Sequence, residues 1–405
     1  IEHEKGSYQE QADKEKSMFS KLMRIFDMIS GEIIDKNKIV YRNDAFGHYL
    51  AGVIYEQHRE YDDARVAYQK SASLYEKGYQ KQYGLDSGMT EQAWFDTIRM
   101  MQKAGGWENE WPLLSQSKLS KTKRTSLRDF NRNGHLMVIE HSGIVPERDE
   151  MNLILTADLN TQEVVVSPIL VGDKTRQMDQ RFWFFALYAD KGIKDLLSAA
   201  YEQRMVPALM QFGLVKREYL GPLWDVADGL GLVSVLKDGM RITVPYYRVS
   251  DFTKSGASTL TVGGENHKLI LGQSVSNLAI QQQLLSSSTD LQEAMARAAF
   301  KNLSAAKVAS LGGDASAVLG FIGKIAANAS AAAETRNWLL LPKQIKITRI
   351  PLAPGQHDVT LASELTDGQS SNHSTSVNIE AGKMSVWKVR SFGHKPGAKT
   401  QQAGL

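Results

Sequence analysis

The sequence contains no cysteine among its 405 residues. This absence excludes disulfide bonds, thiolate metal sites and cysteine nucleophiles. A cytosolic protein of this length usually carries a few thiols, whereas secreted and periplasmic proteins pair them or avoid them. The lack of cysteine therefore favours the cell envelope over the cytoplasm.

The sequence also lacks a long hydrophobic run and an excess of one charge. Its densest apolar stretch, 182–188, is far shorter than the roughly 18 to 20 residues of a membrane-spanning helix. The 48 basic and 45 acidic residues give a net charge of +3, which argues against a dedicated nucleic-acid binder. With 42% hydrophobic residues, the composition is that of a globular protein of two or three domains.

The first residues have neither an initiator methionine nor the apolar core of a signal peptide. The segment 1–6 is typical of the interior of a polar helix. We therefore expect a mature or truncated chain whose targeting signal, or lipidated residue, lies before Ile1.

Residues 1–104 are predicted to be helical and tetratricopeptide-like, with an apolar stripe between 18 and 34 at three- and four-residue steps. Within 45–78, small and aromatic residues recur at the spacing of one such repeat, in which small residues let paired helices approach. Asp62 and Asp63 are predicted to lie at a helix N-terminus. One repeat cannot bury its own faces, so neighbouring helices are implied. The residues that carry the repeat pattern are Gly52, Tyr55, Ala64, Tyr68 and Ala72.

Residues 105–133 are predicted to be a connector. This segment carries two tryptophans and then a basic, serine-rich run. Such a run suits a solvated linker, and the alternative is a surface for phosphate or anionic lipid.

From Gly134 the pattern changes to strands, and 134–342 is predicted to be an α/β domain. A helical insertion is expected at about 157–235. Its large apolar side chains must be buried, either in their own domain or against a neighbouring subunit. Further helices are expected at 275–311 and 315–333.

The end of the chain, 343–393, is predicted to form two successive β-hairpins of a small β-sandwich, followed by a mobile tail at 394–405. The expected fold class is therefore α+β. The strands of the two hairpins are expected at 343–350, 356–363, 374–379 and 384–391.

The sequence offers no constellation of catalytic, cofactor-binding or metal-ligating residues. Its nine histidines do not cluster, and no nucleotide-binding loop or hydrolase motif occurs. His135 and His141 lie on one face of a strand about 20 Å apart, too far to share a metal. In the segment 334–342, Arg336, Trp338 and Pro342 are predicted to be structural anchors. We expect Trp338 to be buried, so that Trp338→Ala costs roughly 3 to 5 kcal/mol.

The order of these segments resembles a family of Gram-negative outer-membrane-associated lipoproteins. The resemblance spans most of the chain except about 157–235, and it implies a lipidated N-terminal cysteine and further helical repeats before Ile1. It implies no catalytic residue. The matching positions are Tyr41, Asp44, Phe46, Tyr49, Gly52, Tyr55, Glu56, Gly143, Pro146, Ile242, Pro245, Tyr247, Ala296, Arg297, Ala298, Lys301, Thr335, Arg336, Trp338, Leu341 and Pro342.

The expected function is that of a non-enzymatic scaffold subunit at the periplasmic face of the outer membrane. Its helical repeats would bind other envelope proteins, and copies of the chain would self-associate, with a ring as one arrangement. The alternative is a peptidoglycan- or glycan-binding regulator of a cell-wall enzyme, and a hydrolase is the least favoured. No cofactor and no nucleic-acid partner are expected. The candidate partner-binding residues are Tyr49, Tyr55, Tyr68, Phe182, Trp183, Phe184, Phe185 and Trp224.

Overall fold

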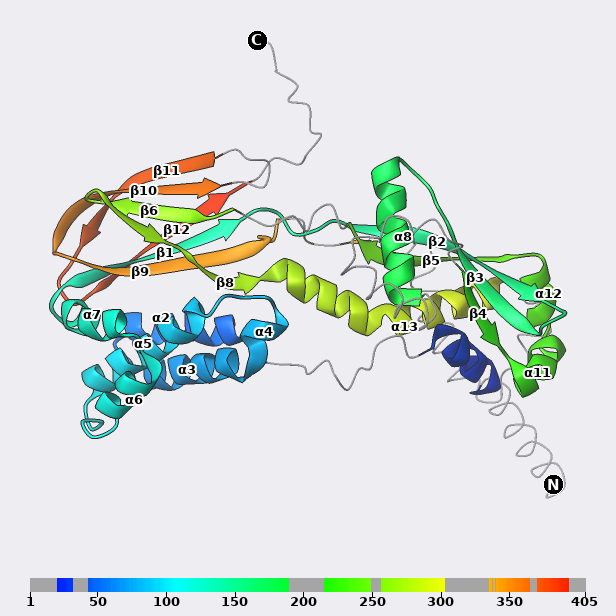
Figure 1. The fold of residues 1–405 in the computed structure, drawn as a ribbon, viewed down its shortest axis with the longest axis horizontal. Helices are drawn as coiled ribbons and strands as arrows, with labels where there is room; N and C mark the ends of the chain where they lie inside the picture. The colour runs from blue at the N-terminus through cyan, green and yellow to red at the C-terminus, as the bar shows by residue number, and fades with distance from the viewer. Residues whose placement is uncertain are drawn as a thin grey trace, which may run out of the picture. The chain divides into compact units, whose positions relative to one another are not determined.

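The chain divides into two compact units, each built from separate segments (Figure 1). Unit 1 consists of Ile1–Ile39, Glu147–Ser250 and Ile280–Asn337, and unit 2 consists of Val40–Pro146, Asp251–Ala279 and Trp338–Leu405. The computed structural model describes residues 20–31, 43–188, 215–248, 256–302, 335, 336, 338, 340–364 and 370–392. Helices dominate the N-terminal half and sheets the C-terminal region, so the predicted α+β class is confirmed.

Unit 2 begins with a layer of helices. Asp44 caps the first of them by accepting a hydrogen bond from the backbone N–H of Phe46. Gly52 lets this helix approach the next one, because a Cβ at that position would lie 2.6 Å from a ring carbon of Tyr68. Asp62 and Asp63 lie in the first turn of the second helix, as predicted. The elements are α2 (Ala45–Gln57), α3 (Tyr61–Leu74), η2 (Tyr75–Tyr79), α4 (Gln80–Gln82), α5 (Gly88–Ala104), α6 (Trp111–Lys118) and α7 (Lys121–Arg132).

The prediction that 105–133 is a connector is wrong, because α6 and α7 occupy most of this range. Ser120 caps α7 by accepting a hydrogen bond from the N–H of Lys123. Leu127 and Phe130, three residues apart on one face, are buried in the core of the unit. This short apolar stripe was not recognised in the sequence because basic residues occupy many of the other positions of the helix.

Two four-stranded sheets complete unit 2. The first has the strand order β12-β1-β9-β8, with β12 parallel to β1 and the other pairs antiparallel. The second has the order β11-β10-β6-β7 and is antiparallel throughout. The strands are β1 (Gly134–Ser142), β6 (Ser258–Val262), β7 (Glu265–Lys268), β8 (Ile270–Ser274), β9 (Gln344–Leu352), β10 (Gly355–Glu364), β11 (Ser370–Ile379) and β12 (Met384–Ser391).

The first sheet lies between the helices and the second sheet, which gives unit 2 three layers (Figure 1). Met137 and Ile139 of β1 pack with the helices, whereas Leu136 and Val138 pack with the second sheet. Because side chains alternate across a strand, the odd-numbered residues of β1 all face the helices. The same alternation directs Arg349 of β9 to the helical side, along with Ile347.

The terminal strands form at the predicted places, but their predicted pairing is wrong. β10 and β11 form a hairpin, whereas β9 pairs with β1 and β8, and β12 pairs with β1. The central sheet is buried on both faces, so its strands find partners far away in the sequence. Local turn signals cannot reveal such pairs.

Unit 1 contains a four-stranded antiparallel sheet with the order β4-β3-β2-β5. The helix formed by residues 20–30 packs against α13, with Gln292 donating a hydrogen bond to Asp27. Trp183 of α8 donates its indole N–H to the carbonyl of Tyr247. The elements are β2 (Arg148–Asp158), β3 (Glu163–Ile169), α8 (Lys174–Tyr188), β4 (Lys216–Tyr219), η3 (Gly221–Leu223), α11 (Trp224–Gly229), α12 (Leu232–Lys237) and β5 (Met240–Tyr247).

The helix α13 (Val275–Asn302) begins in unit 2 with residues 275–279 and continues in unit 1. The range of the helical insertion expected at about 157–235 contains α8, η3, α11 and α12, but it also contains β3 and β4, which form half of the sheet of unit 1. The helix expected at 315–333 and the tail expected at 394–405 lie outside the described residues.

Candidate functional site

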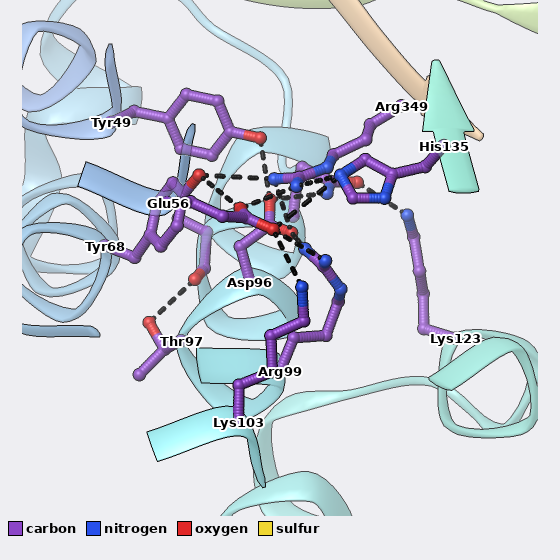
Figure 2. A network of polar contacts seen from close by, with 12 residues as sticks. Tyr49, Glu56, Tyr68, Asp96, Thr97, Arg99, Lys103, Lys123, His135 and Arg349 are labelled. Atoms are coloured by element: carbon purple, nitrogen blue, oxygen red, sulfur yellow. Dashed lines mark hydrogen bonds and ion pairs between the residues drawn. The ribbon is translucent and has the colours of Figure 1, made fainter. Parts of the chain in front are cut away.

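The most concentrated group of charges lies between the helices and the first sheet of unit 2 (Figure 2). Arg349 Nη2 lies 2.6 Å from Glu56 Oε2, and Arg349 Nη1 lies 3.0 Å from Asp96 Oδ1. Arg99 completes the set, with its Nη2 2.8 Å from Glu56 Oε1 and its Nη1 2.8 Å from Asp96 Oδ1. Two guanidinium groups and two carboxylates thus alternate in a closed cycle, here called the ionic ring.

Hydroxyl and amide groups satisfy the remaining carboxylate oxygens of the ionic ring. Tyr49 donates to Asp96 Oδ2 at 2.7 Å, and Gln92 donates to the same oxygen at 2.8 Å. Tyr68 donates to Glu56 Oε2 at 3.0 Å. The side chains of the four charged members are at most 3% exposed, so the ring is removed from solvent.

The protonation of Glu56 follows from the two opposing effects of its site. Burial alone raises the pKa of this carboxyl, but the guanidinium groups of Arg349 and Arg99 outweigh burial and hold the pKa well below its usual range. The carboxylate is therefore charged at neutral pH.

His135 of β1 borders the ionic ring and is uncharged. Burial lowers the pKa of its imidazole far below the usual value, and the charges of Arg349 and Arg99 lower it further. Its Nε2 accepts a hydrogen bond from Arg349 Nη2 at 2.6 Å, which places the ring proton on Nδ1. That Nδ1 makes no hydrogen bond with any described residue.

The ionic ring connects elements that are distant in sequence: Glu56 from α2, Asp96 and Arg99 from α5, and Arg349 from β9. Each charge of the ring faces an opposite charge, and each carboxylate is hydrogen-bonded within the unit. A buried charge that loses its partner is strongly destabilising. The ring therefore fixes the helices on the sheet and is a structural centre.

A second charged group in unit 1 surrounds Asp149 of β2. Its Oδ1 lies 2.7 Å from Arg176 Nη2, and its Oδ2 lies 3.2 Å from Arg248 Nη2 and 3.2 Å from the Tyr246 hydroxyl. Burial raises the pKa of Asp149, but a backbone N–H from Glu150 and the two arginines lower it more, so the net shift is downward. The arginine side chains remain about a third exposed, at 32% and 37%.

A cavity of about 510 Å³ lies in unit 2 beside the start of α13, and Lys346 and Ser258 are among its lining residues. Lys346 Nζ donates to the carbonyl of Gly256 at 2.7 Å and to Ser258 Oγ at 2.9 Å. A serine and a lysine at this distance can form a nucleophile and base. Ser258 is only 1% exposed, however, and Lys346 also lies 3.9 Å from the buried carboxylate of Glu140. The bond between Lys346 and Ser258 therefore joins β9 of the first sheet to β6 of the second, with the serine hydroxyl buried.

An exposed apolar patch lies where β1 and β12 end. Trp338, Leu340 and Phe392 are 69%, 73% and 53% exposed. Arg390 donates to the carbonyls of His141 and Leu340, and its guanidinium carbon lies 4.5 Å from the centre of the Phe392 ring. These contacts place the Arg390 guanidinium against the Phe392 ring and the backbone of Leu340. We call Trp338, Leu340, Leu341 and Phe392 the apolar patch.

Most of the residues selected from the sequence as partner-binding are buried. Only Tyr55 and Phe182 are substantially exposed, at 39% and 40%. Tyr49 and Tyr68 instead donate hydrogen bonds to the carboxylates of the ionic ring. The remaining buried aromatic residues lie in the core of unit 1. The buried members are Tyr49, Tyr68, Trp183, Phe184, Phe185 and Trp224.

The prediction that Trp338 is buried is wrong, since this side chain is among the most exposed apolar groups of the described residues. Arg336 is exposed and Pro342 is half-buried. The tryptophan precedes β9 in a turn, where its own N–H and C=O groups do not enter the sheet. The turn is held instead by the carbonyl of Leu341, which accepts from the N–H of Val145.

Sequence reasoning did not identify the ionic ring, although two signals were present. Arg349 continues the alternating face of Ile345 and Ile347, so a charge stands at a core position of a strand. Asp96 and Arg99 lie in the stretch from Trp94 to Met101, whose other residues, apart from one threonine, are large and apolar. Charges at core positions of different elements indicate a buried ion network, because each needs a partner.

Among the described residues, no group of three or more histidine, aspartate or glutamate side chains could hold a metal ion. None of the described helices combines the length and apolar character needed to cross a membrane. Comparisons with protein-family models, with curated proteins and with solved structures gave no match.

Proposed function

We propose that this chain is a non-enzymatic scaffold subunit of a cell-envelope assembly, which binds a partner protein through the apolar patch of unit 2. The single observation that carries the proposal is the exposure of Trp338, Leu340 and Phe392, in two segments that Arg390 joins through the Phe392 ring and the Leu340 carbonyl. Tryptophan and arginine are enriched among the residues that dominate binding energy at protein interfaces. An exposed apolar group held rigid loses little conformational entropy on binding.

The framework beneath the patch supports this proposal. The ionic ring and the central sheet join helices and strands into one unit. A partner bound at the patch is therefore attached to the helices as well. The close contact of Gly52 with the Tyr68 ring resembles the packing of a tetratricopeptide helix pair. We extend the proposal to a tetratricopeptide-like helical layer that offers a further surface for partner segments.

The placement at the periplasmic face of the outer membrane rests on the sequence, through the missing cysteine and the resemblance to envelope lipoproteins. Fractionation of cells that express the complete gene tests it. Recovery of the protein with outer membranes is expected, and recovery in the cytosol would remove the envelope from the proposal.

A photo-crosslinking residue placed at Leu340 tests the binding surface in the complete protein in cells. We expect one discrete crosslinked product containing an envelope protein, and we expect Arg390→Ala to weaken it because the patch loses its support. The matched control is the same residue at Leu159, a leucine of unit 1 that is 48% exposed. Equal products at both positions, or none at Leu340, would refute the proposed surface.

The alternative of a glycan-binding regulator is favoured by one feature, the exposed indole of Trp338. A flat aromatic surface of this kind offers an apolar face beside a polar rim. A pulldown with purified cell wall distinguishes the two functions. Retention that is lost in Trp338→Ala supports glycan binding, whereas protein that stays in the supernatant counts against it.

A further inference from the structure

The edge strands of a β-sheet expose unpaired backbone N–H and C=O groups, which attract the strands of other molecules. Proteins protect such edges with short strands, charged residues, proline or bulges. The described edge strands of this chain follow that rule with one exception. β12 carries Lys388 and Arg390, β8 has a register shift between Leu271 and Gln273, β7 and β4 have four residues and several charges, and β5 carries Arg241 and Pro245.

The exception is β11, which lies at the outside of the second sheet of unit 2 (Figure 1). It has ten residues, Ser370–Ile379, and none of them is charged or proline. Its register with β10 is continuous from Gly355↔Ile379 to Glu364↔Ser370. The strand is therefore long, regular and unprotected.

The direction of the unpaired groups of β11 follows from one contact. Ser385 Oγ donates to the carbonyl of Asn378, so the backbone groups of Asn378 point away from β10. In an antiparallel strand these directions alternate from residue to residue. Asn372, Ser374 and Ser376 therefore also direct their N–H and C=O groups outward, and their side chains are exposed.

We propose that β11 is a pairing edge at which two copies of this chain join their sheets as antiparallel neighbours. This inference rests on the self-association included in the expected scaffold function, and it specifies the surface. Two-fold pairing places Ser374 opposite its own copy and Asn372 opposite Ser376 of the partner subunit. The outward groups of these three residues then form about six hydrogen bonds between the chains.

A second copy fits this edge better than an unrelated strand, because the edge is self-complementary. Pairing about Ser374 needs no second surface, since a two-fold interface uses the same residues on both sides. The lack of charge means that no like charges meet when two copies approach. The two four-stranded sheets become one continuous sheet of eight strands.

Charged substitutions on β11 test whether two copies of the chain pair at this edge. The double variant Asn372→Lys, Ser376→Lys places lysine opposite lysine twice in the dimer, and Asn372→Glu, Ser376→Glu does the same with glutamate. We expect the dimer dissociation constant of each variant to rise at least about tenfold, because like charges directly opposite oppose pairing. A mixture of the two variants should form a heterodimer again.

Sedimentation equilibrium of the complete chain, from about 1 to about 500 μM, measures these constants in the range expected for a small interface. Asn266→Lys, an exposed position of β7 at the opposite edge of the same sheet, is the matched control and should leave association unchanged. Asn372→Pro removes one outward N–H without removing a bond to β10, and it should weaken the dimer as well.

Three results would overturn the proposal. These are a monomeric wild type over the whole range, a dimer that both double variants retain, and a mixture that stays monomeric although the wild type dimerises. The crosslink at Leu340 is read separately. It shows whether the apolar patch binds its partner even if pairing at β11 is refuted.

Discussion

The ionic ring of unit 2 and the group around Asp149 in unit 1 contain the same chemistry in different surroundings. Both combine two arginines with carboxylates at hydrogen-bond distance. The ring is at most 3% exposed, whereas Arg176 and Arg248 are 32% and 37% exposed. In the ring water cannot replace a lost partner, while around Asp149 it can. We therefore expect burial, more than the number of contacts, to decide what each ion pair contributes to stability.

The largest expected difference between the two groups comes from removing one arginine of each. Arg349→Ala leaves Asp96 with Arg99, and Glu56 with Arg99 and the more distant Lys103, and we expect it to lower the free energy of unfolding by about 3 to 5 kcal/mol. Arg248→Ala, the matched change around Asp149, should cost less than about 1 kcal/mol. Urea unfolding followed by circular dichroism measures both. Equal losses would show that burial does not distinguish the two groups.

The dependence of stability on pH sharpens the same comparison. His135 keeps a strongly lowered pKa in the folded protein, whereas in the unfolded chain it binds a proton below about pH 6.5. Above about pH 6.5 the uncharged His135 therefore does not reduce the free energy of unfolding. As the pH drops from 6.5 to 5, the free energy of unfolding falls by up to about 1.4 kcal/mol per pH unit. Glu56 adds a loss of the same sign only at lower pH, because its own pKa is lowered below 4.5.

His135→Gln should remove this dependence on pH, because glutamine does not bind a proton in this range. Its side-chain oxygen can still accept the hydrogen bond from Arg349. The control is His141→Gln, whose imidazole is half-buried and has a pKa lowered by burial and by Arg390 and Lys388. It should remove a smaller part of the slope. Thermal melting points at pH 7, 6 and 5 measure the effect, and an unchanged slope in His135→Gln would mean that His135 is protonated in the folded state.

The smallest effect is expected at the apolar patch. Trp338→Ala removes an exposed side chain and should change the free energy of unfolding by less than about 0.5 kcal/mol. It should nevertheless reduce partner binding. A loss near the 3 to 5 kcal/mol expected for a buried tryptophan would show that the side chain is covered in the folded protein.

The elements of this fold were predictable from the sequence to the extent that their signals are local. The alternation of apolar residues located β10 and β12, and the repeat pattern of small and aromatic residues located α2 and α3. The partners of β1 were not predictable. Its contacts with β9 and β12 depend on which strands fit a sheet that is buried on both faces, and no local pattern records that choice.

The apolar patch and the ionic ring were missed for opposite reasons. Trp338 was expected in the core because large aromatic residues are usually buried, but its turn lies outside the sheet. Arg349 lies in the strand expected at 343–350, yet a single arginine gives no indication of where its carboxylates are. The available signal was in α5, where Asp96 and Arg99 occur among large apolar residues.

The ionic ring also bears on how the chain emerges from the ribosome. Arg349 and Glu56 are 293 residues apart in the sequence. At a synthesis rate of roughly 5 to 20 residues per second, about 15 to 60 s pass between the synthesis of Glu56 and that of Arg349. During that time Glu56, Asp96 and Arg99 together carry an excess negative charge that the nascent helices cannot bury without penalty. The helical layer is therefore expected to stay loosely packed, and open to chaperones, until β9 is synthesised and docks.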